Sequence, residues 1–256
     1  MLEIKHLCAG YGNFPVLRDV SLSCESGAIT TVIGANGCGK STLLKSAVGL
    51  TDISSGEILL NGNEITKMRE NLRAQNISYL AQGKNVPDIT VENLVLHGRF
   101  PYLSYPRRYR ACDRAAAWEA MKKMGVDSLA DKYLRELSGG MRQKVYIAMA
   151  LCQETDVILM DEPTSYLDID RQFRLAETMK RLAEEGRTVV AVLHDIILAL
   201  KISDKIAVME NGHIVSAGTP EEILKEKIIP RIFHVDIFPV LCEGEIEYVY
   251  RKVENS

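Results

Sequence analysis

The stretch Gly34-Ala35-Asn36-Gly37-Cys38-Gly39-Lys40-Ser41-Thr42 decides how the rest of the chain is organised. It follows the apolar run 29–33 and leads into 43–48, so it lies where a buried strand gives way to a helix. It matches the phosphate-binding pattern GxxxxGK(S/T). Its glycines let backbone N–H groups reach phosphate oxygens, and the helix adds its positive N-terminal end. We therefore expect nucleotide contacts from Gly34 to Thr42, with Lys40 on the β- and γ-phosphates and Ser41 offering its hydroxyl to Mg²⁺.

The composition is that of a globular chain of one large or two small domains. Its 256 residues are 46% apolar and 25% charged. The net charge of −3 gives no reason to expect a nucleic-acid partner, which needs a basic face. No run approaches the roughly 18 apolar residues of a membrane span. The start, residues 1–5, resembles neither a signal peptide nor a myristoylation site.

The six cysteines are scattered, and no pair has the spacing of a metal or redox site. Free thiols in a reducing compartment are therefore expected. Cys38, inside the phosphate loop, fits as a small filler, with a redox switch as the alternative.

Two buried strands end in groups that suit nucleotide chemistry. Val157-Ile158-Leu159-Met160-Asp161-Glu162 is an apolar run ending in two carboxylates, as at the functional end of a parallel strand. Asp161 can hold Mg²⁺, and Glu162 can polarise the attacking water. The run 188–193 ends in His194, which can contact the γ-phosphate, although a lone histidine at a strand end is more often structural.

The composition shifts between residues 85 and 153, where the sequence predicts only helices and loops, with strands on either side. This favours an all-helical subdomain inserted into an α/β core. Leu137-Ser138-Gly139-Gly140 precedes a long helix and forms a second anion-binding helix start. One γ-phosphate needs only one anion-binding helix start. We therefore expect two copies of the chain to associate so that this segment of each copy contacts the nucleotide bound to the other.

These residues together resemble the ATP-binding cassette (ABC) ATPases along nearly the whole chain. Seven segments match that family's motifs in its order: Gly34–Thr42 (Walker A), Val157–Glu162 (Walker B and catalytic glutamate), Leu137–Gly140 (signature), Gln82 (Q-loop), Tyr11 (A-loop), 165–168 (D-loop) and His194 (switch histidine). The resemblance implies a P-loop NTPase core with an antiparallel β subdomain. It divides the chain into a core (1–84 and 154–227), a helical subdomain (85–153) and a C-terminal extension (228–256).

The resemblance also assigns roles to individual residues. Tyr11 would stack on adenine, although a tyrosine on a loop edge is usually just a half-buried side chain. Glu162, His194, Lys40 and Gln82 would be catalytic, and Ser41, Gln82 and Asp161 would serve Mg²⁺. Ser138, Gly139 and Gly140 would act on the partner's ATP. Two residues depart from the family: Met141 stands at the usual glutamine of the signature, and Tyr166 at a usually small D-loop position.

Shorter segments, such as His97-Gly98-Arg99-Phe100-Pro101, look like importer ATPases for iron–siderophore complexes, haem and cobalamin. The expected function is ATP hydrolysis that drives uptake through a separate polytopic permease, supplied by a substrate-binding protein, at the cytoplasmic face of the membrane. The aromatic, basic loop 100–110 suits docking to the permease or simple exposure to solvent. A soluble ABC ATPase of iron–sulfur assembly, and a regulator without turnover, are the alternatives.

Overall fold

The computed structural model describes residues 1–81, 86–165 and 167–252. The predicted site residue Gln82 and the D-loop residue Tyr166 lie outside this part of the chain. None of its helices is long and apolar enough to cross a bilayer.

A six-stranded sheet forms the centre of the fold, in the order β10-β9-β3-β8-β7-β6. Its strands run parallel except β10, which forms a hairpin with β9. Every residue of β3, β7 and β8 is buried, as expected for parallel strands covered on both faces. The strands are β3 (Ile29–Gly34), β6 (Ile77–Leu80), β7 (Val157–Asp161), β8 (Thr188–Val192), β9 (Lys205–Glu210) and β10 (His213–Gly218).

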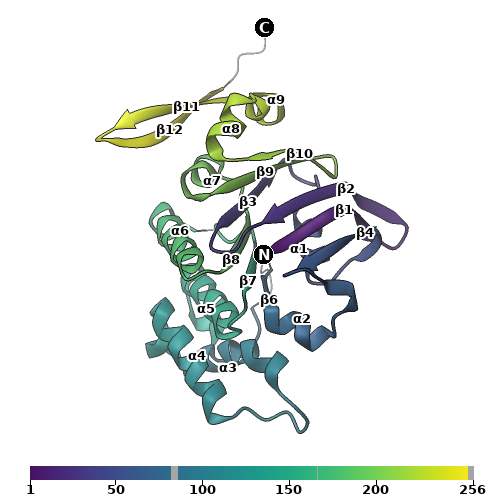
Figure 1. Cartoon of the computed structure of the whole chain (residues 1–256). Coiled ribbons are helices and arrows are strands. Elements are labelled where there is room, and N and C mark those ends of the chain that lie inside the picture. The colour runs from purple at the N-terminus through teal and green to yellow at the C-terminus, as the bar shows by residue number, and fades with distance from the viewer. Residues whose placement is uncertain (82–85, 166, 253–256) are drawn as a thin grey trace.

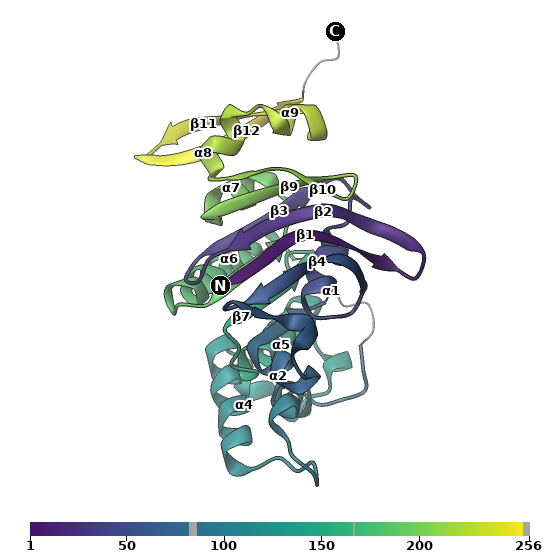
Figure 2. The same cartoon turned by 45° about the vertical axis from the view of Figure 1, so that its right-hand side comes forward.

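The second sheet is antiparallel, in the order β2-β1-β4-β5, and covers one face of the first (Figures 1 and 2). Helix α1 (Lys40–Ala47) lies between the sheets, because its apolar side chains share one buried cluster with residues of both. The strands are β1 (Leu2–Tyr11), β2 (Phe14–Cys24), β4 (Asp52–Leu60) and β5 (Asn63–Glu64). The short helices η1 (Ile65–Lys67) and α2 (Glu70–Asn76) follow this sheet.

The other face of the six-stranded sheet packs against a lobe of helices (Figure 1). In its described part, segment 85–153 contains helices and no strand, which confirms the predicted helical insertion. Its helices are α3 (Val91–Leu96), η2 (His97–Tyr102), α4 (Ala111–Met124), η3 (Asp127–Leu129), η4 (Leu134–Glu136) and α5 (Gly139–Cys152).

The chain ends in a segment that projects from the sheet (Figures 1 and 2). Helices α6 (Ile169–Glu184) and α7 (Ile196–Ile202) belong to the core, and α8 (Pro220–Lys225) and α9 (Ile228–Phe233) follow β10. The last element is a hairpin of β11 (Val235–Cys242) and β12 (Glu245–Lys252).

Two predicted local structures were wrong in their extent. The glycine-rich stretch 9–13 predicts a turn, but the turn is only Gly12-Asn13, because β1 continues to Tyr11. Gly10 is a strand residue at a close approach, since a β-carbon there would lie 2.0 Å from the Phe14 carbonyl oxygen. The residues 66–74 predict a single helix, but an extended backbone at Met68 divides this stretch into η1 and α2.

Candidate nucleotide-binding site

The phosphate loop joins β3 to α1, as the sequence predicts. Gly37 has φ 77° and Gly39 has φ 111°, backbone conformations that L side chains rarely adopt. Helix α1 starts at Lys40, and no side chain caps it in the described structure. Its first N–H groups are therefore available to an anion.

The Lys40 ammonium group lies inside this loop. Lys40 is buried, and its Nζ donates to the carbonyl oxygens of Gly34 at 2.8 Å and Ala35 at 3.0 Å. These contacts use two of the three donors of an ammonium group. The loop thus holds the positive charge at its centre, where phosphate oxygens would meet it.

The carboxylate of Asp161 connects β7 to this loop. Its Oδ1 accepts a hydrogen bond from Ser41 Oγ at 2.9 Å, so two of the three predicted Mg²⁺ ligands lie together. The third, Gln82, is outside the described residues. Across the described residues, no group of three His, Cys, Asp or Glu side chains could hold a metal ion by itself. Mg²⁺ in nucleotide sites usually takes one or two protein oxygens and completes its shell with phosphates and water, which these two oxygen donors fit.

Tyr79 on β6 is a site residue that no sequence motif predicts. Its hydroxyl donates to the second carboxylate oxygen of Asp161 at 3.0 Å. The pKa of Tyr79 is raised above its usual range, mainly because the side chain is buried. The negative charge of Asp161 and its hydrogen bond raise this pKa further, and Tyr11 adds a smaller effect. Tyr79 therefore stays a hydrogen-bond donor and fixes the orientation of Asp161.

Glu162 and His194 meet at the carboxyl ends of β7 and β8. Oε1 of Glu162 lies 2.7 Å from Nε2 of His194, and Oε2 accepts a hydrogen bond from Ser165 Oγ at 3.2 Å. Glu162 has φ 51°, an unfavourable backbone for a residue with a side chain. Such strain persists where the surroundings fix it and is common at functional sites.

The hairpin β1–β2 lies over the phosphate loop. A β-carbon added at Gly39 would lie 3.0 Å from Leu17 Cδ2 and 3.5 Å from Val16 Cγ1. At the tip of this hairpin, Tyr11 is 43% exposed and pairs with Phe14, which is 78% exposed. Paired residues of antiparallel strands project from the same face, so two exposed aromatic rings lie together there. Of these two aromatic residues, the sequence motifs predict a role only for Tyr11.

The signature segment lies apart from this cluster within the chain. Ser138 caps α5 by accepting a hydrogen bond from the backbone N–H of Met141, while Gly139 and Gly140 begin the helix. Among the described residues, no hydrogen bond joins 137–140 to the phosphate loop. This fits the expectation that these residues serve another copy of the chain.

Comparison with known proteins defines the class. The family model described as "ABC transporter" matches residues 17–165. Petrobactin import ATP-binding protein FpuD of Bacillus anthracis is 38% identical over 92% of this chain and 87% of its own length. Ferric enterobactin transport ATP-binding protein FepC of Escherichia coli K12 is 40% identical over 91% and 86%. The chain therefore belongs to the ABC transporter family and is one of its ATPase cassettes.

Solved structures agree in fold. A chain from an inward-facing structure described as a metal-chelate type ABC transporter superposes with TM-score 0.85 at 26% identity, over 99% of this chain and 97% of its own. The dimeric bacterial ABC transporter cassette MJ0796 gives TM-score 0.75 at 27% identity, over 86% and 99%. The predicted fold class, a P-loop core with a β layer and a helical insertion, is confirmed.

Proposed function

We propose that this chain is the ATP-hydrolysing subunit of an importer that takes up an iron complex, a siderophore or haem, or cobalamin, through a separate membrane permease. The observation that carries the choice of importer is the likeness over nine tenths of the chain to ATP-binding proteins named for petrobactin and ferric enterobactin. These relatives favour import over the alternative, a soluble ATPase of iron–sulfur assembly.

ATP binds between two copies of the chain in this proposal. The loop 34–42 of one copy holds the phosphates, and Ser138, Gly139 and Gly140 of the other complete the site. The related cassette MJ0796 is described as dimeric, which supports this arrangement. Exposed apolar side chains near the two motifs, Met141 and Ile169, suit a face that a second copy covers.

Glu162 is the general base of the reaction. His194 and Ser165 hold its two carboxylate oxygens, so that Glu162 accepts a proton from the water that attacks the γ-phosphate. Lys40 neutralises charge on the phosphate oxygens. Gln82, which is outside the described residues, would sense the γ-phosphate and the metal.

Ser41 and Asp161 would hold Mg²⁺, with Tyr79 orienting Asp161. When bound there, Mg²⁺ neutralises charge on the β- and γ-phosphate oxygens. The adenine ring would lie against Tyr11, with Phe14 beside it as a second aromatic surface.

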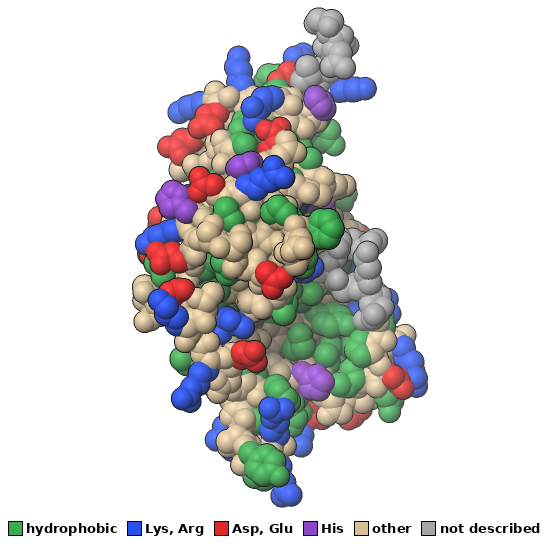
Figure 3. All heavy atoms as spheres, turned by 90° about the vertical axis from the view of Figure 1, so that its right-hand side faces the viewer, with side chains coloured by type: hydrophobic (Ala, Val, Ile, Leu, Met, Phe, Trp, Pro, Cys, Tyr) green, Lys and Arg blue, Asp and Glu red, His purple; other side chains and the backbone are tan. Residues whose placement is uncertain are grey.

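The permease would dock on the helical lobe, at the cytoplasmic face of the membrane. Hydrophobic side chains gather in a hollow on one face of the molecule (Figure 3). On the loop 100–110, Tyr105 is 96% exposed and the guanidinium of Arg107 lies 4.6 Å from the centre of the Phe100 ring. A substrate-binding protein would act on the outer side, without touching this chain.

We also propose that the chain is divided into a core (1–84 and 154–227), a helical subdomain (85–153) and a C-terminal extension (228–256).

The variant Glu162→Gln tests this proposal with three readouts: turnover, dimer formation and co-purification. A general base contributes about 10²- to 10⁴-fold to rate, so turnover should fall by about that factor. ATP with Mg²⁺ should then hold the variant as a dimer in size-exclusion chromatography, and the trapped protein should co-purify with a polytopic membrane protein from its own cells. Unchanged turnover would contradict the role of Glu162, and capture of soluble assembly proteins alone would contradict import.

A further inference from the structure

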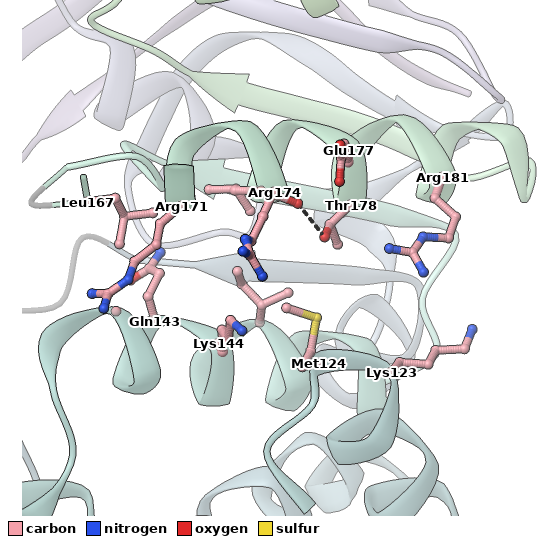
Figure 4. A pocket seen from close by; sticks show the side chains of 13 residues that line it. Lys123, Met124, Gln143, Lys144, Leu167, Arg171, Arg174, Glu177, Thr178 and Arg181 are labelled. Atoms are coloured by element: carbon pink, nitrogen blue, oxygen red, sulfur yellow. Dashed lines mark hydrogen bonds between the residues drawn. The ribbon is translucent and has the colours of Figure 1, made fainter. Parts of the chain in front are cut away.

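Helices α5 and α6 run side by side, and the side chain of Arg171 lies between their first turns (Figure 4). Helix α5 begins with the signature segment 137–140, capped by Ser138. Helix α6 follows the D-loop segment 165–168 and is capped by Asp168. Arg171 thus lies where two motifs of the family meet in one chain.

The Arg171 guanidinium fills the space beside Gly140 that a side chain would otherwise occupy. A β-carbon added at Gly140 would lie 2.2 Å from Nη1 of Arg171 and 2.7 Å from its Cζ. The three atoms nearest to that position all belong to Arg171. The absence of a side chain at Gly140 therefore lets a cation rest directly on the start of the signature helix.

Asp168 holds Arg171 in this position. One carboxylate oxygen, Oδ1, accepts the backbone N–H of Arg171 at 3.0 Å and caps the helix, while Oδ2 lies 3.2 Å from Nε of the same residue. An exposed ion pair alone contributes little, but here the carboxylate is already fixed by the cap. Gln143, one turn further along α5, adds a link to the stretch that precedes the D-loop, because its Nε2 donates to the Pro163 carbonyl oxygen at 2.9 Å.

We propose that Arg171 is a positioning residue for the ATP-bound dimer, which holds the signature segment 137–140 in a fixed place relative to Asp168 at the end of the D-loop. The inference rests on the proposed function, in which both segments face the partner's nucleotide. If the two segments moved independently, each would have to be ordered separately when the dimer closes. Because Arg171 holds the two segments together, less conformational entropy is lost when ATP closes the dimer.

Arg171 lines a groove between α5 and α6, and a second arginine in this groove, Arg174, offers a matched control. Arg174 lies one turn further along α6 and lines the groove with Arg171 (Figure 4). Its Nε pairs with Asp170 Oδ2 at 2.9 Å, and none of the atoms nearest to Gly140 belongs to it. Arg174→Ala therefore removes an equal charge from the same helix without touching the signature segment.

The test measures dimer formation rather than turnover, in the Glu162→Gln background. The fraction of dimer is followed against ATP concentration, at fixed Mg²⁺, by analytical ultracentrifugation. Arg171→Ala should raise the ATP concentration for half-maximal dimer by about 2- to 30-fold, the range of mutations that act through coupling. Arg174→Ala should leave it unchanged. Binding of a fluorescent ATP analogue to the monomer should be the same in all variants.

Arg171→Lys distinguishes position from charge, because lysine keeps the charge but lacks the planar fork. We expect it to recover only part of the loss, and full recovery would overturn a positioning role. Equal shifts for Arg171→Ala and Arg174→Ala, an unchanged curve for Arg171→Ala, or weaker binding of nucleotide to its monomer would each overturn the inference. A parent that stays monomeric at saturating ATP would instead contradict the proposed function.

Discussion

At the scale of single residues, both carboxylate oxygens of Asp161 accept hydrogen bonds. Tyr79 donates its hydroxyl to one oxygen, and Ser41 donates to the other. Partners that orient metal-binding side chains typically contribute about 10- to 100-fold to metal affinity. Tyr79→Phe removes only this hydroxyl. We expect it to raise by about 10-fold the Mg²⁺ concentration needed for tight ATP binding, measured with a fluorescent ATP analogue, and for half-maximal hydrolysis.

Tyr102→Phe is the matched control for this prediction. Its hydroxyl also donates inside the protein, to the Gln153 carbonyl oxygen at 2.7 Å, but in the helical lobe. The control should leave the Mg²⁺ requirement unchanged. Equal Mg²⁺ curves for the wild type and Tyr79→Phe would show that Ser41 and the backbone suffice to orient Asp161.

The contrast between Asp161 and Tyr79 shows what a sequence can predict at this scale. Asp161 and Glu162 end an apolar run. Carboxylates do not stabilise an apolar core, so their position alone predicts a functional site. A tyrosine inside a strand fits the core equally well. Its partner lies 82 residues away in sequence, and only the pairing of β6 with β7 brings the two together.

At the scale of elements, one buried arginine joins three parts of the helical lobe. Arg99 on η2 pairs with Asp113 of α4 at 3.3 Å, and its Nη1 lies 2.7 Å from Glu154 and donates to the carbonyl oxygen of Cys152, the last residue of α5. Burial alone would raise the pKa of Asp113, but hydrogen bonds from Arg110 and Arg99 lower it below its usual value. Asp113 is therefore a buried charge that depends on its partners.

Arg99→Met should destabilise the protein by about 3 kcal/mol, because it leaves the Asp113 carboxylate buried with too few partners. Urea unfolding measures the change. Adding Asp113→Asn, which removes the charge but can still accept the hydrogen bond that caps α4, should recover part of the loss. A loss below about 1 kcal/mol for Arg99→Met would mean that water or Arg110 replaces the missing partner.

This network also explains the segment 97–101, which supported the likeness to importers. Gly98 lies against α5, where a β-carbon would be 2.3 Å from the Met149 carbonyl oxygen, and Arg99 is buried. The segment therefore maintains packing of the lobe in this chain rather than contact with cargo. The helices of the lobe were predictable from their patterns, whereas their junctions depend on contacts between distant residues.

At the scale of the whole molecule, the motifs predicted the layers because each motif requires a strand, a loop and a helix in order. The C-terminal hairpin was less predictable. Two strands alone are marginally stable, and β11–β12 depends on contacts outside its own sequence. Ile237 and Tyr248 pack on the core, and Glu247 pairs with Lys201 of α7. The sequence of 228–252 accordingly predicts no more than a mixture of short helix and strand.

The two cores on either side of the six-stranded sheet each bury a thiol, Cys24 in one and Cys152 in the other. Burial raises the pKa of Cys24 to about 11 and that of Cys152 to about 12, from an ordinary value of 9.0. The folded protein therefore keeps protons that the unfolded chain releases above pH 9. The free energy of unfolding should be unaffected by these thiols below pH 9 and fall between pH 9 and 11 by up to about 1.4 kcal/mol per pH unit for each thiol.

The pH dependence of urea unfolding measures this loss, and a variant isolates the thiols from lysines and tyrosines that also titrate there. Cys24→Ala combined with Cys152→Ala lowers stability below pH 9, where the thiols carry their protons in both states, because it leaves cavities in both cores. Its stability should nevertheless fall less steeply above pH 9 than that of the wild type. Parallel curves would mean that the thiols ionise in the folded protein as readily as in the unfolded chain, and thus that alkaline pH opens both cores before the sheet unfolds.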